Sequence, residues 1–211
     1  MRIIEVPLGE RSYPIYIGHE IWSELSTVLQ QRLTPGKALL ISDEHVFPLY
    51  GAKTAAALKK AGFTVTSAVV PVGESSKSVA QAESLYTKAI KAGLNRTDPV
   101  VALGGGVVGD LAGFIAATYL RGVPFVQIPT SLLAQVDSSV GGKVAVNHQL
   151  GKNLIGTFYQ PRLVWIDLSV LNTLPQHEFL AGAAEVVKYG AILSKPLVQT
   201  LENRWDDLLK K

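Results

Sequence analysis

The sequence contains no cysteine, a single methionine and no long uninterrupted apolar run. The absence of cysteine excludes disulfide bonds and thiolate metal sites, so a cytoplasmic location is the simplest expectation. None of the apolar runs reaches the length of a membrane-spanning helix, and the first residues lack the apolar block of a signal peptide. We therefore expect no membrane partner.

A strong excess of charge of one sign is also missing. The chain carries 20 Lys and Arg against 17 Asp and Glu, which gives a formal net charge of +3. No dense stripe of basic residues with interleaved aromatics is present, so nucleic acid is not an expected partner. A small anionic substrate fits this balance better. With 47% hydrophobic residues in 211, the chain has enough apolar material to fill a core.

What the chain does contain is an alternation of short apolar runs with segments of helical spacing. The runs predict strands at residues 2–7, 13–17, 37–42, 64–70, 100–103, 124–128 and 163–167. The intervening segments predict helices at residues 21–33, 52–61, 78–92 and from the glycines near 106 to 119, with a short helix at 132–136. This order predicts an α/β fold, with a Rossmann-like, mostly parallel sheet and helices on both faces, over residues 1–174.

Two segments depart from the alternation. Residues 138–156 are glycine-rich and polar and predict a long functional loop. From residue 175 the pattern is purely helical, over 178–192 and 197–209, with little else to pack on. We expect residues 175–211 to be the first helices of an all-α second domain whose remainder is absent from this chain.

A glycine turn follows the strand at residues 100–103. Gly104, Gly106 and Gly109 have the G-x-G-x-x-G spacing at the start of a predicted helix, which suits a phosphate held by backbone N–H groups. An ordinary dinucleotide fold places an acidic residue about 20 positions further on to bind the ribose. No Asp or Glu lies between Asp110 and Asp137, so the acids that follow the strand at 37–42 are the candidates for that role.

Ligands of such sheets bind at the carboxyl ends of the strands. The predicted topology therefore gathers one set of residues at a single rim, where a dinucleotide could lie: Asp43, Glu74, Lys77, residues 104–110, Thr130 and Ser131.

Charged residues downstream of the glycine turn admit a functional and an ordinary interpretation. Arg121 suits the end of a helix, and Lys143 and Lys152 suit a solvated loop. Glu185 and Lys188 share a helix face and could form a surface pair, but small and apolar residues surround Glu185, where an unpaired carboxylate is costly. The four histidines form no recognisable metal spacing with it. The residues alone indicate an NAD-type nucleotide site beside a basic pocket for an anion.

Several longer segments, taken together and in order, resemble the 3-dehydroquinate synthase family of the shikimate pathway. They are residues 104–114, 119–122, 129–143, 151–156 and 185–190. The resemblance implies conversion of 3-deoxy-D-arabino-heptulosonate 7-phosphate into 3-dehydroquinate and phosphate. It also implies catalytic use of NAD, a divalent metal (zinc or cobalt), and a homodimer, which is usual for the family.

The resemblance also implies roles for individual residues. Glu185 matches a metal ligand of the family. Matches to substrate-contacting positions are Lys143, Asn153, Lys188 and Arg121, with Asp137 beside them. Matches to NAD-contacting positions are Asp43, Glu74, Lys77, Gly105, Gly106, Val107, Asp110, Thr130, Ser131, Lys143, Lys152 and Thr173.

The chain departs from the family pattern after its last helix. Members continue into a helical domain with two histidine metal ligands, which neither His148 nor His177 matches. We therefore expect at most one third of the metal site and little activity from this chain alone. Three alternatives stay open: another sugar-phosphate cyclase such as an inosose or valiolone synthase, a relative of metal-dependent glycerol dehydrogenase, and an NAD-binding module without turnover.

Overall fold

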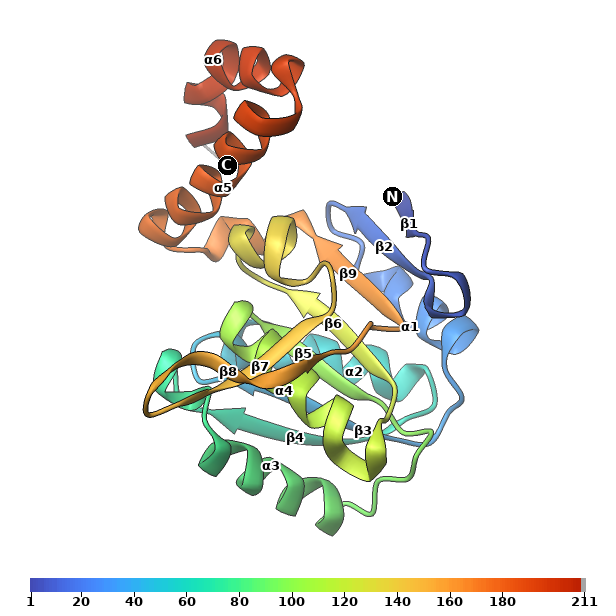
Figure 1. Ribbon diagram of the computed structural model, residues 1–211. Coiled ribbons are helices and arrows are strands. Elements are labelled where there is room, and N and C mark those ends of the chain that lie inside the picture. The colour runs from blue at the N-terminus through green and yellow to red at the C-terminus, as the bar shows by residue number, and fades with distance from the viewer. Residues whose placement is uncertain (210–211) are drawn as a thin grey trace.

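The computed structural model describes residues 1–209, and a seven-stranded sheet forms its centre (Figure 1). The strands lie in the order β1 (Arg2–Val6), β2 (Tyr13–Gly18), β9 (Leu163–Asp167), β6 (Phe125–Pro129), β5 (Val100–Gly104), β3 (Lys37–Asp43) and β4 (Thr64–Val70). Only β1 and β2 pair antiparallel among these strands, and every other neighbouring pair is parallel. The mostly parallel sheet predicted from the sequence is confirmed.

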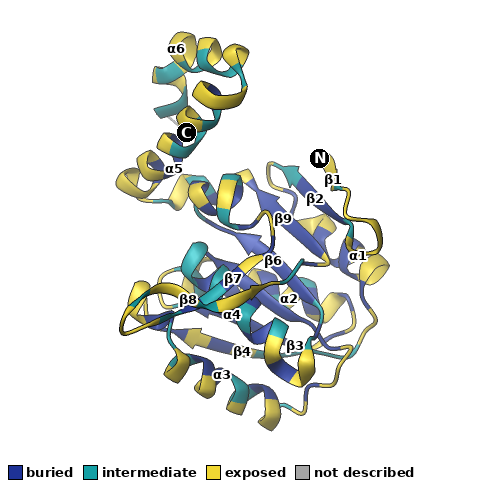
Figure 2. Ribbon diagram, viewed as in Figure 1, coloured by how far each residue is buried: buried dark blue, intermediate teal, exposed yellow. Residues whose placement is uncertain are grey.

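Helices cover both faces of this sheet, because its inner strands are apolar on both sides. Along β3, Leu39 and Ile41 belong to one core, which they share with α3 (Val79–Lys91) and α4 (Gly106–Thr118). Ala38 and Leu40 belong to the opposite core, shared with α1 (Trp22–Arg32) and α2 (Ala52–Lys60). The central strands β5, β6 and β9 are buried throughout (Figure 2), as the predicted α/β architecture requires.

The predicted loop at residues 138–156 is wrong. The chain there forms an antiparallel hairpin of β7 (Lys143–His148) and β8 (Gly151–Phe158), which lies over α4 (Figure 1). Val144 and Val146 point inward and join the core beneath, which gives β7 the alternation of a half-buried strand. Gly113 of α4 permits this close approach, since a Cβ there would lie 3.0 Å from both Val144 Cβ and Phe125 Cε1.

The hairpin therefore covers the outer side of α4, while the sheet covers its inner side. This double burial explains why α4 is apolar around most of its circumference.

Two helices leave the sheet at the C-terminal end, α5 (Gln176–Leu193) and α6 (Lys195–Leu209) (Figures 1 and 2). They follow a short helix, η6 (Leu168–Thr173), that the sequence analysis did not predict. A small core around Leu132, Phe179 and Ala183 joins α5 to the rest of the chain. Residues 210 and 211 of the expected second domain lie outside the described residues. Within residues 1–209, no helix has the length and apolarity needed to cross a membrane.

Candidate active site

The glycine turn joins the buried strand β5 to α4 at the carboxyl edge of the sheet. Gly104 pairs in register with Pro129 of β6, and its carbonyl accepts the N–H of Thr130 at 3.0 Å. A Cβ on Gly104 would lie 2.7 Å from Val108, and one on Gly106 would lie 3.1 Å from Ser138 Oγ. Close packing, rather than a left-handed backbone, therefore explains these two glycines. The first N–H groups of α4 have no partner within the helix and suit an anion.

A cavity of about 870 Å³ opens at this turn. It is bordered by the segments that follow β3, β4, β5 and β6 and by the start of α5. Ten of the residues predicted to contact NAD line it: Asp43, Glu74, Lys77, Gly105, Gly106, Val107, Asp110, Thr130, Ser131 and Thr173. The structure thus brings together at one rim the residues that the sequence placed there.

Polar and apolar side chains that follow β3 both line this cavity. Asp43, at the end of β3, is fixed because one carboxylate oxygen accepts the backbone N–H groups of His45 and Val46, each at 2.9 Å. The Tyr50 hydroxyl lies 2.7 Å from Thr173 Oγ1, and the Tyr50 ring stacks on Trp22 with centroids 5.9 Å apart. Together with Val46, the Tyr50 ring forms an apolar wall near the Asp43 carboxylate.

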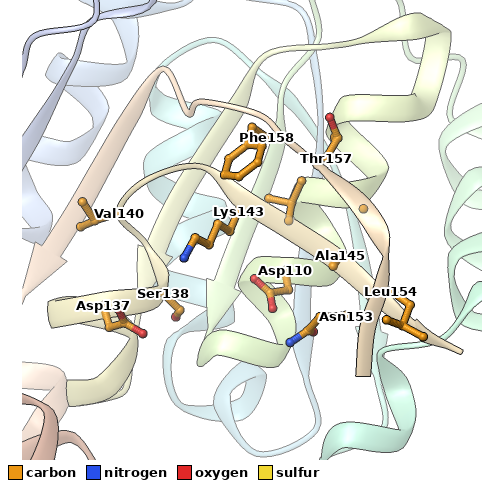
Figure 3. Close-up of a pocket in the computed structure, with 12 residues that line it drawn as sticks. Asp110, Asp137, Ser138, Val140, Lys143, Ala145, Asn153, Leu154, Thr157 and Phe158 are labelled. Atoms are coloured by element: carbon orange, nitrogen blue, oxygen red, sulfur yellow. The ribbon is translucent and has the colours of Figure 1, made fainter. Parts of the chain in front are cut away.

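A second cavity, of about 650 Å³, lies between η5 (Ala134–Ser138), α4 and the outer hairpin (Figure 3). Predicted substrate contacts Asp137, Lys143 and Asn153 line it, and Figure 3 shows the Lys143 side chain extending from β7 toward the space between Asp137 and Asp110. Asp110 lines both cavities, so they share a wall.

Lys77 forms the polar centre of that wall. It is 5% exposed, and its ammonium forms an ion pair with Asp110 and donates a hydrogen bond to Asn153 Oδ1. A buried lysine requires such partners, because an unpaired charge away from water is costly. Burial raises the pKa of the Asp110 carboxyl above its ordinary value, and the hydrogen bond and charge of Lys77 oppose that rise.

A second cluster connects the cavity wall to α5. Glu185 and Lys188 form an ion pair one helical turn apart, and the Glu185 side chain is 15% exposed. The Tyr189 hydroxyl donates to Asp137 Oδ1 at 3.1 Å, and the Lys188 ammonium lies 4.9 Å from the centre of the Tyr189 ring. The hydrogen bond to Glu185 raises the pKa of Lys188, which keeps that ammonium charged.

The sequence analysis missed Tyr189, although the residue follows Lys188 directly. Its contact with Asp137 joins positions 52 residues apart and depends on how α5 packs against η5. Its spacing was the signal that could have identified it, because Tyr189 lies four residues after Glu185, a carboxylate in apolar surroundings.

Two of the predicted residues do not join these groups. Arg121 lies in η4 (Tyr119–Arg121), at the opposite end of α4 from Gly106, and lines neither cavity. Lys152 is exposed on β8 and also lines neither cavity. Their roles remain predictions.

The described residues do not fit a complete metal site. Within residues 1–209 no three His, Cys, Asp or Glu side chains are placed to hold one ion together. A catalytic zinc takes three protein ligands, so Glu185 alone cannot hold it.

Comparison with known proteins places this geometry in context. The family model described as 3-dehydroquinate synthase N-terminal matches residues 67–181. A 3-dehydroquinate synthase of Desulforamulus reducens is 55% identical over 209 residues, which are 99% of this chain and 58% of that protein. The chain thus spans less than two thirds of that relative.

Two solved structures of cyclases share the fold. One is the 2-epi-5-epi-valiolone synthase of Streptomyces hygroscopicus with NAD+ and Zn2+, at a TM-score of 0.86 and 30% identity over 97% of this chain and 56% of that one. The other is a 2-deoxy-scyllo-inosose synthase with carbaglucose-6-phosphate, NAD+ and Co2+, at a TM-score of 0.82 and 30% identity over 89% and 51%. The glycine turn, the outer hairpin and most residues that line the cofactor cavity lie in the segment that the family model matches, whereas the lining residues that follow β3 precede it. This chain belongs to the 3-dehydroquinate synthase family.

Proposed function

We propose that this chain is the NAD-binding part of a 3-dehydroquinate synthase, the enzyme that converts 3-deoxy-D-arabino-heptulosonate 7-phosphate into 3-dehydroquinate and phosphate. One observation carries the proposal: ten positions predicted to contact NAD line one cavity at the N-terminus of α4. The curated relative at 55% identity favours this substrate over those of the valiolone and inosose synthases, at 30% identity.

The residues that line the cavity support this proposal, because their chemistry suits a dinucleotide. Backbone N–H groups at residues 105–107 would bind the pyrophosphate, because the positive end of the α4 dipole lies there. The Asp43 carboxylate would accept hydrogen bonds from ribose hydroxyls, and the apolar wall beside Tyr50 would contact the adenine. When bound, NAD+ supplies a reversible hydride acceptor.

The second cavity would hold the sugar phosphate. Lys143 provides positive charge for a phosphate or carboxylate, and Asn153 provides an amide for a hydroxyl. Lys188 lines neither cavity; it lies beside the Tyr189 ring, whose hydroxyl bonds Asp137 at the second cavity, and its predicted substrate contact stays a proposal. Asp137 would orient the substrate from the other side, with its own position set by Tyr189. Asp110 and Lys77 form the wall between this cavity and the cofactor cavity, so their ion pair would lie between the two ligands.

We do not propose that this chain binds the catalytic metal ion by itself. Glu185 is proposed as one ligand of a divalent ion, since zinc or cobalt is present in the two cyclase structures. The part of the relatives that this chain does not span would have to supply the others. We accordingly propose that the chain binds NAD+ with little turnover.

We also propose a homodimer. The outer hairpin exposes the apolar side chain of Leu150, which lines neither cavity and is 86% exposed, and a second copy could cover it. Sedimentation at several concentrations would test this, and a monomer at every concentration would contradict it.

A phosphate-release assay tests the functional assignment. With the heptulosonate phosphate, NAD+ and zinc, the full-length Desulforamulus reducens relative should release phosphate, and this chain should release less than about one hundredth as much. Full turnover by this chain would contradict the incomplete site. If a longer protein that contains this chain turned over a different cyclase substrate and consumed none of the heptulosonate phosphate, the proposed substrate would be overturned.

A further inference from the structure

Asn147, near the end of β7, connects three separate segments. Its side-chain amide donates to Glu74 Oε1 at 2.6 Å, and its side-chain carbonyl accepts the backbone N–H of Asn153 at 2.9 Å. Its own backbone N–H donates to the carbonyl of Lys77 at 2.8 Å. One side chain therefore uses both ends of its amide to join η3 (Glu74–Ser76) to β8.

The residues that Asn147 holds belong to different cavities. Glu74 and Lys77 line the cofactor cavity, and Asn153 lines the second one. Asn147 itself is not among the described residues that line either cavity. Its two side-chain hydrogen bonds are exposed to solvent, so Asn147 contacts these residues from outside both cavities.

Asn153 needs such support because of its backbone. Its φ is +58°, in the left-handed region that non-glycine residues adopt less readily, although asparagine tolerates it better than most. The bond from the Asn153 N–H to Asn147 holds this conformation, and in it the Asn153 side chain meets the Lys77 ammonium. Releasing that bond would free Asn153 to leave Lys77.

We propose that Asn147 is a positioning residue that fixes Glu74 and Asn153 relative to each other across the wall between the two cavities. The proposal rests on the function proposed above for the effect on NAD+, while the placement of Asn153 is independent of any ligand. A residue that only stabilised the hairpin would need its bond to the Asn153 N–H, whereas the positioning role also requires the bond to Glu74.

Variants that reverse the hydrogen bond between Asn147 and Glu74 distinguish a positioning role of Asn147 from a role in hairpin stability alone. Asn147→Asp keeps an acceptor for the Asn153 N–H but places a second carboxylate against Glu74. Glu74→Gln restores the pairing in the double variant, because the new amide can donate to the new carboxylate. The wild type, the two single variants and the double variant form a double-mutant cycle, which isolates the coupling between Glu74 and Asn147.

Calorimetric titration of NAD+ into the four proteins is the first measurement. We expect Asn147→Asp to weaken NAD+ about tenfold in the wild-type background and less than about twofold in the Glu74→Gln background. Equal weakening in both backgrounds would overturn the positioning role, since it would show that Glu74 and Asn147 act independently.

Hydrogen exchange without ligand is the second measurement. Asn147→Ala should speed exchange at the Asn153 amide at least about fivefold, whereas Asn147→Asp should leave it near the wild-type rate. Unchanged exchange in Asn147→Ala would overturn the proposal. If the wild-type chain binds no NAD+, the proposed function fails, and this exchange measurement still decides whether Asn147 positions Asn153.

Discussion

The Lys77 ammonium and the Asp110 carboxylate form an ion pair within the wall that separates the two cavities. Their side chains are 6% and 20% exposed, so water screens the pair little. The pair joins Lys77, which directly follows η3, to Asp110 on the first turns of α4, and the Asn153 side chain contacts Lys77 from the hairpin.

Removing the lysine should destabilise the fold. Lys77→Met leaves the Asp110 carboxylate without its cation, which we expect to cost about 2–3 kcal/mol in the free energy of unfolding. Urea denaturation at neutral pH measures this. The double variant Lys77→Met, Asp110→Asn should recover more than half of the loss, and no recovery would show that lost packing, not the unpaired charge, is responsible.

The titration of Asp110 provides a second prediction. Burial raises its pKa above the ordinary 3.8, so the folded protein holds this proton more tightly than the unfolded chain. The contribution of this group to stability is therefore present at pH values below 3.8 and is lost as the pH rises through the folded pKa.

Carbon-detected NMR of the Asp110 carboxyl measures this pKa directly. We expect a midpoint above 3.8. A midpoint below the ordinary value would mean that the attraction of Lys77 outweighs burial.

Tyr189 offers a test of how α5 is held. Tyr189→Phe removes only the hydroxyl that donates to Asp137, so we expect about 1 kcal/mol less protection of α5 amides against hydrogen exchange. Burial, followed by the bond to Asp137, raises the pKa of Tyr189, so the hydroxyl stays a donor throughout the neutral range.

Tyr86→Phe is a matched control for that experiment. The Tyr86 hydroxyl lies 2.6 Å from Thr118 Oγ1, and Tyr86 lines neither cavity. Its substitution should leave α5 exchange unchanged. Equal effects of the two variants on α5 would contradict a specific contact between Tyr189 and Asp137.

Much of the fold was predictable because the sheet is buried on both faces. Strands such as β3 and β5 are continuous apolar runs, and the segments between them have helical spacing. Ser78, three residues before Gln81, has the spacing of a capping box, and its hydroxyl accepts the Gln81 N–H at 3.2 Å at the start of α3. Residues at the carboxyl ends of these strands then follow from topology alone.

The outer hairpin could not be predicted in the same way. Gly141, Gly142, Gly151 and Gly156 suggest a loop, and only Val144 and Val146 alternate as a strand requires. Their packing on α4 decides the structure, and that packing is a tertiary effect. The contacts of Lys77 with Asp110 and Asn153 depend on the same packing, so the sequence showed the residues without their pairing.

The central claim is that NAD+ binds in the cavity at the N-terminus of α4, and a titration with Gly106→Val tests it most directly. A valine there would fill space beside the helix N–H groups, and its Cβ would lie 3.1 Å from Ser138 Oγ and 3.6 Å from Ser138 Cβ. Ala80→Val, on the exposed side of α3, is the control for the added methyl groups. By calorimetry we predict NAD+ binding to the wild-type chain and to Ala80→Val, with at least about tenfold weaker binding to Gly106→Val. No binding to the wild-type chain, or equal affinity in Gly106→Val, would contradict the account.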